Sequence, residues 1–236
     1  MMDWTLAIRR NREALLRILA ALFALVGLAG QDPAGVPKGA TLPRHLHAHA
    51  LRILRAAESA IRRLVVIAAR EVVVQPRRGS SPVYGGGVAE GDGGGGVAQT
   101  PIRIPAFPLL DPLKRFSFEP PRRASKFMPR ICVVGFTEPA PLPQKPVVSP
   151  DDPVDATGLC SRLLSSRRAL ANLPREARRL AHWQARNRLK RMPRRVAPLR
   201  FGAPPGRRKR PTHEVDDILK ECHALALDIL SPPDTS

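Results

Sequence analysis

The proline- and glycine-rich stretch of residues 76–157 limits most strongly what this chain can fold into. It holds 15 Pro and 10 Gly among its 82 residues. Proline breaks helices and central strands, and glycine raises the entropic cost of ordering a segment. Regular structure therefore has to come from the residues on either side. We predict a mainly α protein in which an N-terminal amphipathic helical hairpin, residues 1–75, and C-terminal helices are separated by a long, largely disordered middle.

The N-terminal segment has the periodicity of an amphipathic helix. The apolar residues that recur at helical spacing are Trp4, Ile8, Leu15, Ile18, Leu22, Leu25 and Val26. Asp3 is placed to cap the start of this helix, and Gly30 is placed to end it. The 13 residues at 18–30 are uncharged. A membrane span and a signal peptide therefore stay open as alternatives to the amphipathic helix.

Residues 45–74 predict a second helix with an apolar arc and a basic arc. The apolar arc consists of Ile53, Leu54, Ala57, Ile61, Leu64, Val65 and Ala68. The basic arc consists of Arg52, Arg55, Arg62, Arg63 and Arg70. Two such helices joined by a short loop predict an antiparallel hairpin held together by its apolar faces. The basic face is then either solvated or laid on an anionic membrane surface.

The middle, residues 76–157, is predicted to be a flexible linker that carries short apolar segments. Its phenylalanines are Phe107, Phe116, Phe118, Phe127 and Phe136. Apolar clusters in a flexible chain either become ordered on a protein partner or pack back onto the helices of their own chain. Residues 130–136 are further predicted to form a short strand.

The net charge of +19 is concentrated in residues 158–211, which carry 17 basic side chains and one acidic side chain, Glu176. This block begins with a helical stripe formed by Leu159, Leu163, Ser166, Leu170, Leu173, Ala177, Leu180 and Gln184. Pro174 lies within the stripe, so the helix either kinks or restarts there. After Met192, five prolines predict an extended basic tail.

The Arg-dense block is the candidate binding site. Like charges at helical spacing repel one another unless an anion screens them, and a chain with this charge attracts polyanions. We predict a non-enzymatic interaction protein that binds a polyanion, nucleic acid, through residues 162–210 without reading its sequence. The candidate polyanion-binding residues are Arg178, Arg179, Arg186, Arg188, Arg191, Arg194, Arg195, Arg207, Arg208 and Arg210. Trp183 and Phe201 are candidates for stacking on bases.

A small membrane-associated scaffold is the alternative function. Its anchor would be the N-terminal helix, and its basic faces would lie on anionic lipid. The expected localisation is cytoplasmic, with peripheral or single-span membrane association under the alternative. The three cysteines form no CxxC pair, which fits a reducing compartment.

The C-terminal segment, residues 212–236, reverses the charge, with six acidic side chains and one basic side chain. Thr212 is placed to cap a helix that Pro232 and Pro233 end. The predicted apolar stripe is Val215, Ile218, Leu219, Cys222, Leu225 and Ile229. We predict that this acidic helix docks on the basic helices of the same chain and competes with an external polyanion for their arginines.

Groups suited to catalysis or metal binding are not gathered into a known pattern. The HLHAH motif places only His45 and His49 on one helical face, whereas a structural zinc site needs four ligands. The glycines around Gly91 lack the strand and the helix that a dinucleotide-binding loop requires. No GxSxG, HExxH or phosphate-loop motif occurs. We therefore predict no enzymatic activity, no cofactor and no metal.

Overall fold

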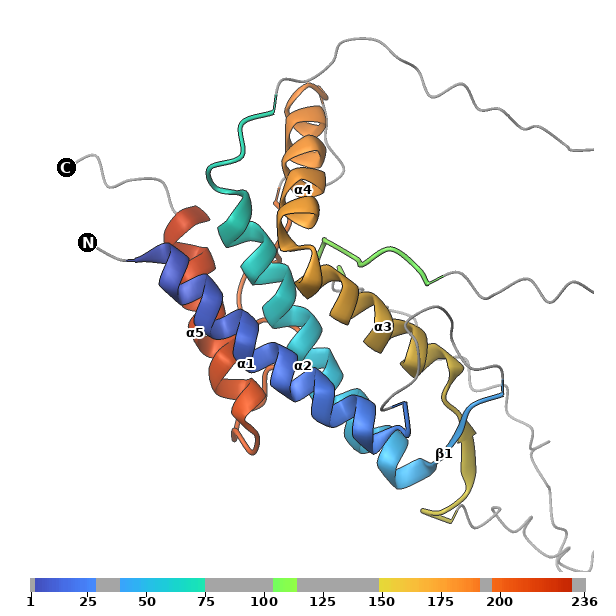
Figure 1. Ribbon diagram of the computed structural model, residues 1–236. Helices are drawn as coiled ribbons and strands as arrows, with labels where there is room; N and C mark the ends of the chain where they lie inside the picture. The colour runs from blue at the N-terminus through green and yellow to red at the C-terminus, as the bar shows by residue number, and fades with distance from the viewer. Residues whose placement is uncertain (1–2, 29–38, 75–103, 114–148, 192–196, 231–236) are drawn as a thin grey trace, which may run out of the picture.

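The computed structural model describes residues 3–28, 39–74, 104–113, 149–191 and 197–230 (Figure 1). Within these ranges lie the helices α1 (Trp4–Leu25), α2 (Arg44–Ala69), α3 (Thr157–Ala171), α4 (Leu173–Arg188) and α5 (Glu214–Leu230). Two short strands, β1 (Thr41–Pro43) and β2 (Pro153–Asp155), complete the described structure. The predicted mainly α class is confirmed. Most of the Pro/Gly-rich middle lies outside the described residues.

Helix α2 is the centre of the fold. It packs against α1, α3, α4 and α5, and α1 runs beside it in the opposite direction (Figure 1). Every residue from Ala56 to Ile67 is buried, because other elements cover all sides of this half of the helix. The apolar arc predicted for this helix is buried as well, apart from a half-buried Ala68.

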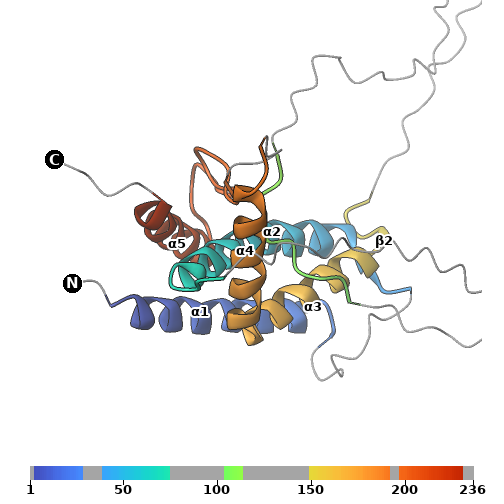
Figure 2. The same ribbon diagram turned by 90° about the horizontal axis from the view of Figure 1, so that it is seen from above.

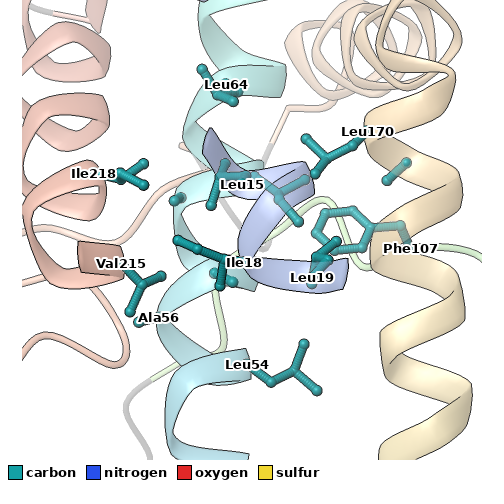
Figure 3. Packing of buried hydrophobic residues seen from close by; sticks show 14 of the residues in the cluster. Leu15, Ile18, Leu19, Leu54, Ala56, Leu64, Phe107, Leu170, Val215 and Ile218 are labelled. Atoms are coloured by element: carbon teal, nitrogen blue, oxygen red, sulfur yellow. The ribbon is translucent and has the colours of Figure 1, made fainter. Parts of the chain in front are cut away.

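Helix α1 is an amphipathic helix whose apolar face belongs to the core. Asp3 caps it, since its Oδ1 accepts a hydrogen bond from the backbone N–H of Leu6 at 3.0 Å. Leu15, Ile18 and Leu19 lie among the buried side chains in Figure 3. The helix ends at Leu25, earlier than predicted, and Gly27 follows with a φ of 74°. No helix in the described ranges is long and apolar enough to cross a bilayer.

Helices α3 and α4 show how the chain accommodates Pro174. Helix α3 ends at Ala171 and α4 begins at Leu173, so Pro174 falls in the first turn of α4. A proline there loses no hydrogen bond, because the first backbone N–H groups of a helix have no partner within it. The predicted stripe is buried from Leu159 to Leu180. Helix α4 therefore restarts the helix in a new direction (Figures 1 and 2).

The two strands form a small antiparallel sheet that the sequence did not predict. Thr41 pairs with Asp155, and Pro43 pairs with Pro153. The pairing joins the chain just before α2 to the chain just before α3. Strands of three residues are too short to show an alternating pattern.

The basic arc predicted for α2 is only partly exposed. Arg52 and Arg55 are exposed as expected, but Arg62 and Arg63 are 4% and 0% exposed. The prediction of a solvated basic face is therefore wrong for these two residues. Asp111, in the segment at residues 104–113, forms ion pairs with both guanidinium groups. Their counter-charge therefore comes from a distant part of the sequence.

Candidate polyanion-binding surface

A buried ion cluster removes two arginines from any candidate surface. Asp111 is fully buried and accepts a hydrogen bond from Nε of Arg62 at 2.8 Å and from Nη2 of Arg63 at 3.0 Å. Arg63 also donates to the backbone oxygen and the Oγ of Ser59, at 2.7 and 2.6 Å. Burial lowers the pKa of Arg63, and the charge of Asp111 opposes that shift. These guanidinium groups therefore belong to the core and are not available to a ligand.

The segment at residues 104–113 is an integral part of this core. Phe107 is 3% exposed and lies among the buried side chains of the bundle (Figure 3). The backbone N–H of Asp111 donates to the carbonyl of Pro198 at 3.0 Å, and its Oδ2 accepts from the backbone N–H of Arg200 at 3.3 Å. Phe107 thus packs on the chain's own helices, which was one of the two predicted alternatives. The other four phenylalanines of the middle lie outside the described residues.

The first arginine of the cationic block also has a structural role. Arg162 on α3 makes two hydrogen bonds with the buried Glu58 of α2, at 2.8 Å each. The hydrogen bonds to Glu58 raise the pKa of Arg162. The predicted binding span of residues 162–210 therefore begins with a residue that joins two helices.

Helix α4 and the residues directly after it present a group of exposed cations, which we call the α4 cluster. All of its members are exposed: Arg175, Arg178, Arg186, Arg188, Lys190 and Arg191. In the part of the chain that the structure describes, no carboxylate lies within ion-pair distance of any of them. Arg179, a predicted site residue, differs because it is half-buried and pairs with Glu176. The inner face of α4, which includes Ala177 and Leu180, packs into the core.

A second cluster comes from the basic tail, and we call it the tail cluster: Arg207, Arg208, Lys209 and Arg210. It is held against α2 by Gly206, which has a φ of 84°. A Cβ at Gly206 would lie 2.8 Å from the backbone nitrogen of Ala56, so only glycine allows this close approach. The exposed Arg52 of α2 extends the tail cluster, because it lines the same cleft as Arg208, although sequence reasoning did not include it in the site. The predicted site residues Arg194 and Arg195 lie outside the described ranges.

The two clusters lie near different ends of α2. Arg208 shares a cleft with Arg52, whereas Arg188 shares a groove with Val66 and Arg70. At 1.5 Å of rise per residue, this places Arg188 and Arg208 about 21 to 27 Å apart along the helix. The C-terminal end of α4 and the segment that leads into α5 both lie on the side of α2 away from α1 (Figure 2).

Helix α5 packs on α2 and α1, and two of its carboxylates form ion pairs with arginines of α1. Its predicted stripe is buried at Val215, Ile218, Leu219, Cys222 and Leu225. Glu221 pairs with Arg10 at 2.5 Å, and Glu214 pairs with Arg17 at 3.4 Å. Within the described ranges these acids are therefore paired away from the α4 cluster.

The other side chains singled out from the sequence have separate environments. Phe201 is 89% exposed, as a base-stacking side chain must be, whereas Trp183 is half-buried and packs against the core. Cys160 and Cys222 are buried thiols, and burial raises the pKa of Cys222 to about 12. Among the residues that the structure describes, no three His, Cys, Asp or Glu side chains gather in a way that suits a metal ion.

The chain matches no protein-family model, no curated protein and no solved structure. Its function therefore has to be inferred from its own residues.

Proposed function

We propose that this protein is a non-enzymatic polyanion-binding protein whose ligand is nucleic acid. The observation that carries the proposal is the α4 cluster, an array of exposed cations without carboxylate partners among the described residues. Arg175 and Arg178 are three residues apart on one helix, a spacing at which like charges repel. A bound polyanion would relieve this repulsion and release its own counterions.

The two clusters favour an extended ligand over a small one. A ligand that reaches both Arg188 of the α4 cluster and Arg208 of the tail cluster has to span about 21 to 27 Å. Duplex DNA advances 3.4 Å per base pair, so about seven base pairs cover this distance. Once the ligand is held at one cluster, its contact with the second cluster forms within the same complex. The overall affinity then exceeds the affinity of either cluster alone.

The contacts would go to phosphates and carry no sequence information. Guanidinium groups form two-pronged hydrogen bonds with phosphate oxygens, and every nucleotide offers the same oxygens. The exposed ring of Phe201 is available to stack on an unpaired base. The burial of Leu15 and Leu22 of α1 in the core favours nucleic acid over the membrane-scaffold alternative, because a membrane anchor would need this face.

Titrations with nucleic acid at two salt concentrations test the proposal. The triple variant Arg178→Gln, Arg186→Gln, Arg188→Gln should bind more weakly. Its logarithmic salt slope should fall by about 0.9 for each phosphate that the variant no longer neutralises. Affinity should also rise steeply once duplexes exceed about seven base pairs.

The matched control removes three exposed cations from outside both clusters, in the variant Arg9→Gln, Arg44→Gln, Lys220→Gln. It changes the net charge by the same amount, so it measures the effect of charge alone. Equal losses of affinity in the two triple variants would mean that binding has no defined site, and the proposal would fail.

A further inference from the structure

A small cleft lies where the tail cluster and the start of α5 meet α2. Its volume is about 70 Å³, enough for a few water-sized groups. The polar residues that line it come from three segments: His49 and Arg52 from α2, Arg208 from the tail, and Thr212, His213 and Asp216 from the start of α5.

The cleft is chemically suited to an anion. Two guanidinium groups and two imidazoles line it, against a single carboxylate, that of Asp216. Asp216 already accepts a hydrogen bond from the backbone N–H of Thr212 at 3.1 Å. The first turn of α5 contains acidic side chains, which offset the positive end of the helix dipole. The positive character of the cleft therefore comes from the basic side chains that line it.

Hydrogen bonds hold two of these donors in place. Nη1 of Arg208 donates to Oγ1 of Thr212 at 2.6 Å, which leaves the other guanidinium N–H groups for a ligand. Nδ1 of His213 accepts from the backbone N–H of Val215 at 3.1 Å. The proton of the neutral imidazole therefore sits on Nε2, which becomes a hydrogen-bond donor.

We propose that this cleft binds one phosphoryl group and that it holds a backbone phosphate when the protein binds nucleic acid. A phosphate carries several acceptor oxygens at tetrahedral angles, and the guanidinium fork matches two of them at once. The cleft would fix one end of an extended ligand, while the α4 cluster attracts the rest. This inference rests on the proposed function and identifies the contact that positions the ligand.

Inorganic phosphate is the probe for the cleft itself. The full-length protein is titrated with phosphate at constant ionic strength and pH, and the ring protons of His49 and His213 are followed by NMR. The variants His49→Gln and His213→Gln assign these signals. We expect both signals to shift and saturate together. Arg208→Gln and Arg52→Gln should each weaken this binding about tenfold or more, since hydrogen bonds between charged groups are strong.

Arg55→Gln is the matched control. Arg55 is also exposed on α2, one turn from Arg52, but it does not line the cleft. Its loss changes the net charge equally and should leave phosphate binding within about twofold of wild type. If Arg52→Gln and Arg208→Gln weaken phosphate binding no more than Arg55→Gln does, the cleft is not a phosphate site. If neither histidine signal responds to phosphate, the inference fails as well.

Nucleic-acid titrations of the same variants separate this inference from the proposed function. Arg208→Gln should weaken duplex binding more than Arg55→Gln does, and inorganic phosphate should compete with the duplex. If the cleft variants lose phosphate but bind duplex like Arg55→Gln, the cleft takes free phosphate and the backbone assignment is overturned. If the cleft variants retain phosphate while the α4 triple variant loses the duplex, the inference fails and the proposed function stands. If no variant alters duplex binding, the proposed function fails, whatever the phosphate titration shows.

Discussion

Arginine has opposite roles in two regions of this molecule. Arg62 and Arg63 are buried in α2 and share one carboxylate, Asp111. Arg178, Arg186 and Arg188 lie on the outer face of α4 with no carboxylate partner among the described residues. The same side chain is thus a core element in one helix and a solvent-facing cation in another.

The difference shows that the structural surroundings of an arginine decide whether it is buried or exposed. The density of arginines along the sequence does not decide this. A buried charge must be compensated, because desolvation costs several kcal/mol for each ion. An exposed charge costs little and is screened by solvent and salt. We therefore expect substitutions in the buried cluster to change stability, and substitutions in the α4 cluster to change binding.

The largest effect is expected from Asp111→Asn. It leaves two buried guanidinium groups without their counter-charge, so the free energy of unfolding should fall by about 3 to 5 kcal/mol. Urea denaturation measures this loss. The control is Asp217→Asn, at an exposed acid on α5, which should change stability by less than about 0.5 kcal/mol. Similar losses in the two variants would show that Arg62 and Arg63 do not depend on Asp111.

A smaller loss is expected from Gly206→Ala, which disturbs the packing of the tail cluster on α2. The matched control is Gly202→Ala, because Gly202 also has a positive φ, 78°, but no atom within 4 Å of its added Cβ. Gly202→Ala should cost about 1 kcal/mol for the backbone conformation alone. Gly206→Ala should cost about 1 to 3 kcal/mol more, since the α2 backbone has to shift. Equal losses in urea denaturation would contradict the close packing at Ala56.

His223, which contacts the buried ion cluster, predicts a modest dependence of protein stability on pH. Nδ1 of His223 accepts a hydrogen bond from Nε of Arg63 at 3.2 Å. Burial, followed by the charges of Arg63 and Arg207, lowers the pKa of His223, with Asp111 opposing the shift. The folded protein thus takes up this proton less readily than the unfolded chain. The contribution to stability is complete above the unfolded pKa, about 6.5, and is lost as the pH falls through the lower, folded pKa.

Thermal unfolding at pH 7.5 and pH 5.5 tests this direction. The drop in Tm on acidification should be smaller for His223→Gln than for wild type. His182→Gln, at an exposed histidine of α4, is the control and should behave like wild type. If the Tm of His223→Gln falls as far as that of wild type, groups other than His223 cause the loss of stability in acid.

Local periodicity predicted the helices but not what packs against them. The apolar stripes of α1, α2 and α5 and the restart at Pro174 follow from the spacing of residues along each helix. Arg62 and Arg63 occupy the same sequence arc as Arg52 and Arg55, so the pattern alone could not separate buried from exposed arginines. The deciding residue, Asp111, lies 48 residues from Arg63 in a proline-rich segment without periodicity.

The candidate site shows the same limit. Composition identified the arginines of α4 and of the tail, but the sequence could not reveal that they form two clusters. Nor could it reveal that Arg52, from a helix far away in the sequence, lies beside Arg208. Gly206 offered one signal, a glycine between Pro205 and Arg207 in a basic run. Its meaning depends on the approach to Ala56, which is a tertiary contact.

The smallest change in stability is expected from Arg178→Gln, in the α4 cluster. Arg175 lies three residues before Arg178 and has the same charge, so the substitution should leave the free energy of unfolding unchanged or raise it by a few tenths of a kcal/mol. The salt slope of nucleic-acid binding should nevertheless fall by about 0.9, the value for one neutralised phosphate. Arg9→Gln, on the exposed face of α1, should change neither quantity. Asp111→Asn is expected to destabilise the core, whereas Arg178→Gln is not. A destabilised Arg178→Gln protein would therefore remove the distinction between the buried and the exposed arginines.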